Sequence, residues 1–234
     1  MLKVNNLNAY YGQFHVLHNI SCDVKKGEVV VILGPNGHGK STLLKAICGL
    51  LNKLNGSIIY KEKDITGWPT ERLVNQGIIY IAETRELFGD MTVLENLRLG
   101  AYAHNARAME KHNLRRVFEL FPRLQERKKQ LASTMSGGEA RMLAIARGLM
   151  SNADFLCIDE PSLGLQPNLR TELFHIIKEI NNQGKTILLV EQNIPQIANL
   201  ASRVYVLEEG CITFQGSANE AAKDERLREI FLGM

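Results

Sequence analysis

Residues 34–41 constrain the fold of this chain more than any other feature. They read Gly-Pro-Asn-Gly-His-Gly-Lys-Ser and match the pattern G-x-x-x-x-G-K-[ST]. The β-branched run Val29–Leu33 precedes them, and Lys40–Ile47 has a helical pattern, so the sequence predicts a strand, a loop and a helix. Small glycines let backbone N–H groups curve around an anion, and the helix presents its positive N-terminal end to it. This segment, here called the phosphate loop, therefore predicts a nucleotide phosphate site.

The residue types within the phosphate loop indicate separate tasks. Lys40 supplies a mobile positive charge for the β and γ phosphates, and the Ser41 hydroxyl suits Mg²⁺, which prefers oxygen ligands. His38 occupies a variable slot of the pattern, so we assign it no catalytic task. The predicted nucleotide contacts in this segment are Gly34, Pro35, Asn36, Gly37, His38, Gly39, Lys40, Ser41 and Thr42.

Two adjacent carboxylates, Asp159 and Glu160, follow the apolar run Phe155–Ile158. Buried charge is costly unless it is paired or bound to metal. Beside a phosphate loop, the first carboxylate can hold Mg²⁺ and the second can face an attacking water. Asp159 is therefore a candidate metal ligand, and Glu160 is a candidate general base or the group that orients the water. The alternative is a solvated strand end with a salt bridge.

Several short apolar runs predict strands buried on both faces of a largely parallel sheet covered by helices. They lie at Val29–Leu33, Gly77–Ile81, Phe155–Ile158, Thr186–Val190 and Val204–Leu207. Residues 92–148 instead show helical periodicity with almost no strand signal. We therefore expect a single domain with a core of residues 1–87 and 151–234 and a helical insertion at about residues 88–150.

Three helix starts have the spacing of a capping box, in which a hydroxyl residue precedes Glu by three positions. They begin at Thr92, Ser136 and Ser217, and the last precedes an amphipathic helix expected to end near Leu232. Ser136-Gly137-Gly138-Glu139 also resembles the phosphate loop in combining a hydroxyl, glycines and exposed N–H groups. It is therefore either a second anion site or a simple N-cap.

Composition excludes several classes of protein. The 28 basic and 25 acidic residues leave a net charge of +3, which is too small to indicate a nucleic-acid partner. The longest apolar runs have about five residues, whereas a membrane span needs roughly 18 to 20. The first residues lack the apolar region that a signal peptide needs. The four scattered cysteines lack metal-ligand or redox-motif spacing, so we expect them to be reduced core residues of a cytosolic protein.

The ordered set of motifs resembles the ATP-binding cassette (ABC) ATPases, and the resemblance covers essentially the whole chain. A phosphate loop is followed about a hundred residues later by Ser136–Glu139, and about 20 residues further by a strand ending in Asp159-Glu160. The resemblance implies an α/β fold of the P-loop NTPase type. Its sheet core is mainly parallel, with an N-terminal antiparallel β portion and a helical insertion subdomain.

The resemblance also implies how the site works, with ATP and Mg²⁺ as cofactors. In the family two cassettes dimerise head to tail, so Ser136, Gly137, Gly138 and Glu139 would meet the ATP held by a second ABC ATPase subunit, in a homodimer or a heterodimer. Tyr11 stands where the family stacks an aromatic ring on adenine, with Tyr10 as a rival candidate.

Three positions depart from the usual family pattern. Glu83 replaces a Gln, Gln192 replaces a switch His, and Leu165 replaces an Asp. Gln192 can donate a hydrogen bond to a γ-phosphate but carries no positive charge. Glu83 can bind Mg²⁺, so the candidate metal ligands are Ser41, Asp159 and Glu83, and the candidate catalytic residues are Glu160, Lys40 and Gln192.

The departures as a group resemble one of the two ATPase subunits of bacterial branched-chain amino acid importers. This resemblance implies membrane permease subunits as partners, a solute-binding protein as an indirect partner, and a peripheral location on the cytoplasmic face of the inner membrane. An ATPase of a urea or amide importer is an alternative, although those ATPases generally keep Gln at position 83. Two further alternatives are a soluble ABC-type ATPase and a P-loop kinase that phosphorylates a small molecule.

Overall fold

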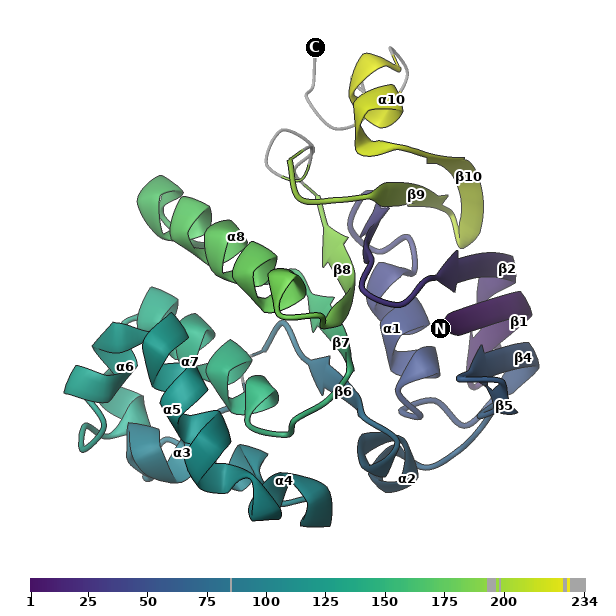
Figure 1. Ribbon diagram of the computed structural model, residues 1–234. Coiled ribbons are helices and arrows are strands. Elements are labelled where there is room, and N and C mark those ends of the chain that lie inside the picture. Colours follow the sequence, from purple (N-terminus) through teal and green to yellow (C-terminus); the bar gives the residue numbers. More distant parts are fainter. Residues whose placement is uncertain (85, 193–196, 198, 225–226, 228–234) are drawn as a thin grey trace.

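The computed structural model describes residues 1–84, 86–192, 197, 199–224 and 227. Two sheets and the helices around them form the layers shown in Figure 1. Asn193 and the predicted helix end at Leu232 lie outside the described residues. Within the described residues, no helix is both long and apolar enough to cross a bilayer.

The larger sheet has six strands in the order β10-β9-β3-β8-β7-β6. All neighbouring pairs run parallel except β9 and β10. The predicted buried runs form five of these strands, because β-branched and aliphatic side chains suit a sheet covered on both faces. The strands are β3 (Val29–Leu33), β6 (Ile78–Ile81), β7 (Phe155–Asp159), β8 (Thr186–Glu191), β9 (Arg203–Glu208) and β10 (Cys211–Gly216).

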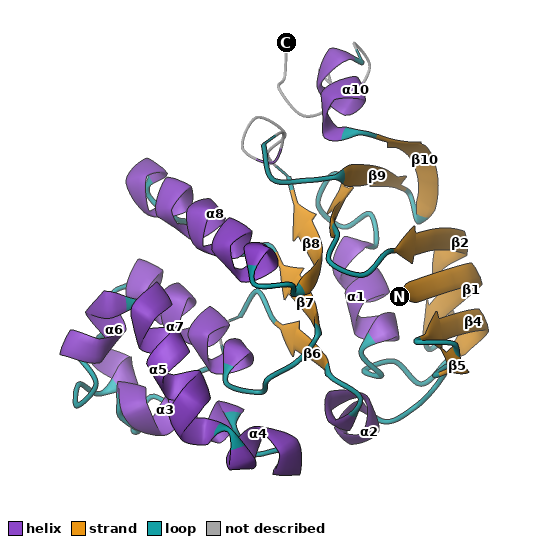
Figure 2. Cartoon of the chain, in the orientation of Figure 1, coloured by secondary structure: helices purple, strands orange, loops and turns teal. Residues whose placement is uncertain are grey.

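The smaller sheet is antiparallel, in the order β2-β1-β4-β5, and lies at the right of Figure 2. Buried and exposed side chains largely alternate along β1, so one face of the sheet is buried and the other is exposed. Its strands are β1 (Leu2–Tyr11), β2 (Phe14–Val24), β4 (Leu54–Tyr60) and β5 (Lys63–Asp64).

Strand β3 divides the hydrophobic core in two because its successive side chains point to opposite faces. Val30 and Ile32 pack in the cluster that holds α1 (Lys40–Ile47) and the smaller sheet. Val31 and Leu33 pack in the cluster that holds α8 (Pro167–Asn182) and α7 (Gly137–Leu149). Helix α1 thus lies between the two sheets (Figure 1), which fixes the phosphate loop at the carboxyl end of β3.

The other helices include a group between residues 93 and 149, which gathers at the left of Figure 1. At Thr92, Ser136 and Ser217 the hydroxyl accepts from the backbone N–H of the Glu three residues later, and that Glu side chain accepts from the cap N–H, so these three helix starts are confirmed. The helices are α2 (Thr70–Asn75), α3 (Val93–Gly100), α4 (His104–Ala108), α5 (Glu110–Leu120), α6 (Pro122–Glu126), the 3₁₀ turn Ala132–Thr134, α7 and α10 (Ala218–Lys223).

Candidate functional site

The phosphate loop joins β3 to α1, and its glycines are required by close packing and by backbone conformation. A Cβ atom at Gly34 would lie 2.1 Å from the carbonyl oxygen of Leu207, and Gly37 and Gly39 have φ angles of 82° and 102°. Gly39 caps α1 without any side-chain hydrogen bond. The first N–H groups of α1 therefore have no side-chain partner at the cap and can bind an anion.

Lys40 is buried at the start of α1, with only 4% of its surface exposed. Its Nζ atom donates to the carbonyl oxygen of Pro35 at 2.9 Å and lies 3.1 Å from Oε1 of Glu160. Glu160, which follows β7, is 7% exposed and has a φ angle of 41°, an uncommon backbone conformation for a residue with a side chain. The predicted cation and the predicted general base are thus held together as a buried ion pair.

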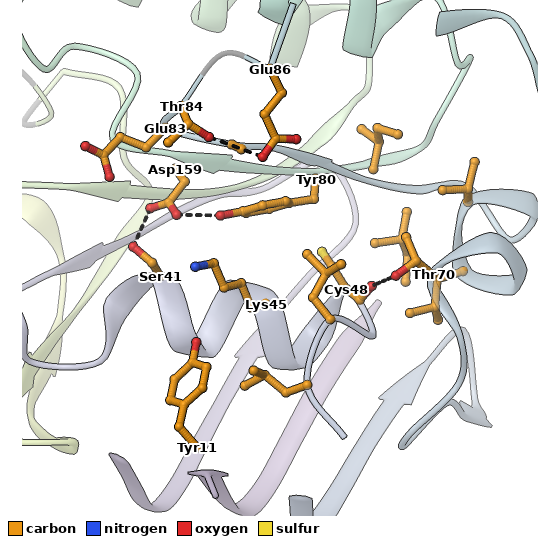
Figure 3. Close-up of a pocket in the computed structure, with 17 residues that line it drawn as sticks. Tyr11, Ser41, Lys45, Cys48, Thr70, Tyr80, Glu83, Thr84, Glu86 and Asp159 are labelled. Carbon is orange, nitrogen blue, oxygen red and sulfur yellow. Dashed lines mark hydrogen bonds between the residues drawn. The ribbon is translucent and has the colours of Figure 1, made fainter. Parts of the chain in front are cut away.

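Asp159, the last residue of β7, is 1% exposed and is held by two hydroxyl groups. Ser41 Oγ donates to its Oδ1 at 3.0 Å, and Tyr80 OH donates to its Oδ2 at 2.7 Å (Figure 3). Burial raises the pKa of Asp159 above its usual range, and the two hydrogen bonds oppose that rise. Sequence reasoning missed Tyr80, because its place beside Asp159 comes from the pairing of β6 with β7.

Gln192 follows β8 and contacts both sides of the phosphate site. Its Nε2 donates to Oε2 of Glu160 and to Oδ1 of Asn36, which belongs to the phosphate loop. Unlike the His that the resemblance leads one to expect, Gln192 makes both contacts without carrying charge. The three predicted catalytic residues, Lys40, Glu160 and Gln192, therefore meet at one point.

A second buried carboxylate, Glu191, lies directly beside this group and was not predicted. It is 3% exposed, and it accepts hydrogen bonds from the backbone N–H and the hydroxyl of Ser162, at 3.1 and 3.0 Å. Burial raises the pKa of Glu191. Ser162 is two residues beyond Glu160, and Glu191 directly precedes Gln192. The contact between Ser162 and Glu191 therefore joins the segment that carries Glu160 to the segment that carries Gln192.

Two adjoining cavities open at the site. A cavity of about 300 Å³ is lined by part of the phosphate loop and by residues of three other segments, namely Asn36, Gly37, Gly39, Lys40, Ser41, Thr42, Glu83, Glu160 and Leu163. A second, of about 550 Å³, is lined by Tyr11, Ser41, Lys45, Glu83 and Asp159, and continues along an apolar wall toward α2. Figure 3 shows Tyr11 on the side of α1 away from Glu83, whereas the side chain of Lys45 points toward Ser41 and Asp159. Ser41 and Glu83 line both cavities.

The two tyrosines at the end of β1 differ in their contacts. Tyr10 stacks on His15, with ring centroids 4.3 Å apart, and Lys53 Nζ lies 5.0 Å from the centroid of its ring. Tyr11 is 43% exposed and lines the larger cavity. The structure thus leaves the ring of Tyr11 accessible at this cavity, while Tyr10 is engaged with its neighbours.

The segment Ser136–Glu139 opens α7 and lines neither of these two cavities. The Ser136 hydroxyl and the backbone N–H groups of Ser136 and Glu139 take part in the capping box. Oε1 of Glu139 also lies 2.9 Å from Nη1 of Arg127. The hydrogen bonds from Ser136 keep the pKa of Glu139 below its usual value. Of the predicted nucleotide contacts, those at positions 136–139 are therefore the ones that one chain does not bring to the phosphate loop.

Comparisons with known proteins agree with this architecture. A sequence profile of the ABC transporter family matches residues 17–163. The chain is 42% identical over its full length, and over all of the relative's length, to the high-affinity branched-chain amino acid transport ATP-binding protein BraG of Pseudomonas aeruginosa. It is 36% identical to the probable branched-chain amino acid transport ATP-binding protein LivF of Archaeoglobus fulgidus, covering all of this chain and 99% of that protein.

A solved structure supports the same assignment. The crystal structure of a nucleotide-free ATP-binding cassette from an ABC transporter superposes with a TM-score of 0.87 at 29% identity, covering 100% of this chain and 99% of that one. The predicted α/β fold is thereby confirmed. With a family profile over more than half of the chain and a 42% identical relative over all of it, the chain belongs to the ABC transporter family, as one of its ATP-binding, ATP-hydrolysing subunits.

Proposed function

We propose that this subunit hydrolyses ATP to drive the import of branched-chain amino acids through membrane permease subunits. The observation that carries the proposal is its full-length similarity to BraG and LivF, both described as branched-chain amino acid transport proteins. The same proposal places the subunit at the cytoplasmic face of the inner membrane as a peripheral protein. It also includes a solute-binding protein as an indirect partner.

The contacts of Lys40 and Glu160 support a hydrolytic mechanism. The Nζ atom of Lys40 lies 3.1 Å from Oε1 of Glu160, and a triphosphate in the phosphate loop would compete with this carboxylate for it. Glu160, still held by Gln192, would then accept a proton from water as the water oxygen bonds to the γ-phosphorus. The bond from that phosphorus to the bridging oxygen breaks, which leaves ADP and inorganic phosphate.

The oxygen atoms near the phosphate loop suit a magnesium ion. Ser41 Oγ and Asp159 Oδ1 lie 3.0 Å apart, and hydroxyl and carboxylate oxygens are ligands that Mg²⁺ prefers. We assign the ion to Ser41 and Asp159, with Glu83, which lines both cavities, as a further ligand. When bound, it supplies positive charge to the phosphate oxygens.

The adenine base is assigned to Tyr11, whose ring is accessible at the larger cavity. Stacking of a base on an aromatic ring contributes about 1–3 kcal/mol. The Ser136–Glu139 segment is assigned to the γ-phosphate of an ATP held by a second cassette subunit. This assignment gives a task to a helix start that lines neither cavity of its own chain.

A third cavity, of about 550 Å³, supports contact with a permease subunit. It lies between the loop after β6 and the helices, and is lined by Glu86, Phe88, Leu99, Arg147 and neighbouring residues. Phe88 and Leu99 are 51% and 37% exposed, so a partner segment could bury both. The predicted helical insertion, at about residues 88–150, would thereby pass movement to the membrane.

The test is release of phosphate from ATP with no acceptor present, comparing the wild type with Glu160→Gln. We expect the Gln variant to lose hydrolysis at least a hundredfold, on the order expected for a lost catalytic base, and to keep its ATP affinity. Glu172→Gln, at an exposed position of α8, is the matched control and should hydrolyse normally. Full activity of Glu160→Gln would refute the assignment.

The cargo needs its own test, because no residue of the described site recognises a transported solute. Uptake of labelled leucine and of labelled urea is compared in cells that carry either the wild type or Glu160→Gln with the same permease subunits. We expect leucine uptake alone to depend on Glu160. Dependence of urea uptake instead would favour the urea importer alternative.

A further inference from the structure

The hairpin turn between β9 and β10 packs directly behind the phosphate loop. Glu208 pairs with Cys211, so the turn has two residues, Glu209 and Gly210, with φ angles of 47° and 75°. The N–H groups of these two residues point out of the hairpin, and both donate to His38. Glu209 N–H donates to Nδ1 of His38 at 2.9 Å, and Gly210 N–H donates to its carbonyl oxygen at 3.1 Å.

The turn is itself held from its other side. The N–H of His18, on β2, donates to the carbonyl oxygen of Gly210 at 2.8 Å. A Cβ atom at position 210 would lie 2.1 Å from the carbonyl oxygen of Val16, so only glycine fits there. The turn is therefore a fixed support, and His38 is bound to it by both its side chain and its backbone.

The neighbours of His38 explain why such a support matters. His38 lies between Gly37 and Gly39, both at positive φ, and glycine has little conformational preference of its own. Gly37, Gly39 and Lys40 line the cavity at the phosphate loop, whereas His38 is not among its lining residues. The loop thus depends on contacts behind it to hold its N–H groups in one arrangement.

We propose that His38 is a positioning residue for nucleotide binding: its Nδ1 anchors the phosphate loop to the β9–β10 turn and so sets the affinity for ATP. The inference rests on the proposed binding of the phosphates by this loop. Because a backbone N–H must donate, Nδ1 is the acceptor, and the imidazole is neutral in this contact. Loss of one such hydrogen bond should weaken ATP binding about two- to tenfold.

Two nearly isosteric variants separate this role from others. In His38→Asn the amide oxygen takes the place of Nδ1 and can accept from Glu209, whereas in His38→Gln the amide lies one bond further out, near the place of Nε2. His175→Gln, exposed on α8, is the matched control. ATP affinity is measured by titration calorimetry on the full chain, and thermal unfolding without nucleotide is measured in parallel.

We expect the dissociation constant for ATP to rise about two- to tenfold in His38→Gln, and to stay within about twofold of wild type in His38→Asn and His175→Gln. Unchanged affinity in His38→Gln, with or without a lower melting temperature, would overturn the inference and leave the proposed function standing. Equal losses in the Asn and Gln variants would also overturn it. A wild-type chain that does not bind ATP would refute the proposed function as well.

Discussion

Replacement of Tyr80 by Phe tests how Asp159 is held. The variant removes the hydroxyl that donates to Oδ2 of Asp159 at 2.7 Å and leaves a carboxylate that is 1% exposed with one donor fewer. A hydrogen bond to a charged group contributes about 1.5–3 kcal/mol. We therefore expect the free energy of unfolding at pH 7 to fall by about that amount. The melting temperature should fall by roughly 2 to 4 °C for each kcal/mol lost.

The loss should depend on pH in a defined direction. Burial raises the pKa of Asp159, so the folded chain holds this proton more tightly than the unfolded chain. Stability from this residue therefore declines as pH rises from the ordinary carboxylate range through the raised pKa. Because the Tyr80 hydrogen bond opposes the pKa rise, Tyr80→Phe should enlarge the decline and extend it to higher pH, and the difference from wild type should shrink at acidic pH.

Tyr60 provides the matched control for this experiment. Its side chain is buried, and its hydroxyl has no hydrogen-bond partner within the part of the chain that the structure describes. Tyr60→Phe should therefore leave stability unchanged or raise it, since an unsatisfied buried hydroxyl is removed. Urea unfolding at pH 7 and pH 4 gives the free energies. The reasoning would be refuted if the two variants lost the same free energy of unfolding, or if Tyr80→Phe were as stable as the wild type.

Three further predictions follow from the same contacts. Asp159→Asn should raise the melting temperature at pH 7, because a buried charge is removed, and should abolish Mg²⁺-dependent hydrolysis. A lower melting temperature than that of the wild type would contradict the first expectation. Glu191→Leu should lower the turnover number more than it raises the KM for ATP, since Ser162 loses both hydrogen bonds while the phosphate loop is untouched; steady-state kinetics decide. Ser136→Ala should cost about 1 kcal/mol of stability through the lost cap, as measured by urea unfolding, and a neutral result would count against the capping box.

Local features of the fold could be predicted from the sequence because their signals lie within a few residues. The helix Lys40–Ile47 has the predicted bounds, and the hydroxyl and Glu spacing placed three helix starts. The buried strands agree because each is a continuous apolar run. Strand β10, whose side chains alternate between exposed and half-buried, lacks that signal, and we did not predict it.

The contacts around the site could not be predicted, because they arise from strand pairing over long sequence separations. Tyr80 reaches Asp159 only because β6 lies beside β7. Glu191 meets Ser162 because β7 pairs with β8, and His38 meets Glu209 across 171 positions of sequence. The sequence predicts which residues bind phosphate, but the residues that hold them in place became visible only in the structure.

The central claim is that two copies bind ATP between the phosphate loop of one and the Ser136–Glu139 segment of the other. The most direct measurement is the molar mass of Glu160→Gln by light scattering, with Mg-ATP, with Mg-ADP, and with Ser136→Glu added to the variant. We expect a dimer with Mg-ATP, a monomer with Mg-ADP, and a monomer whenever the added carboxylate faces the phosphate. A monomer at saturating Mg-ATP, or a dimer that tolerates Ser136→Glu, would contradict the claim.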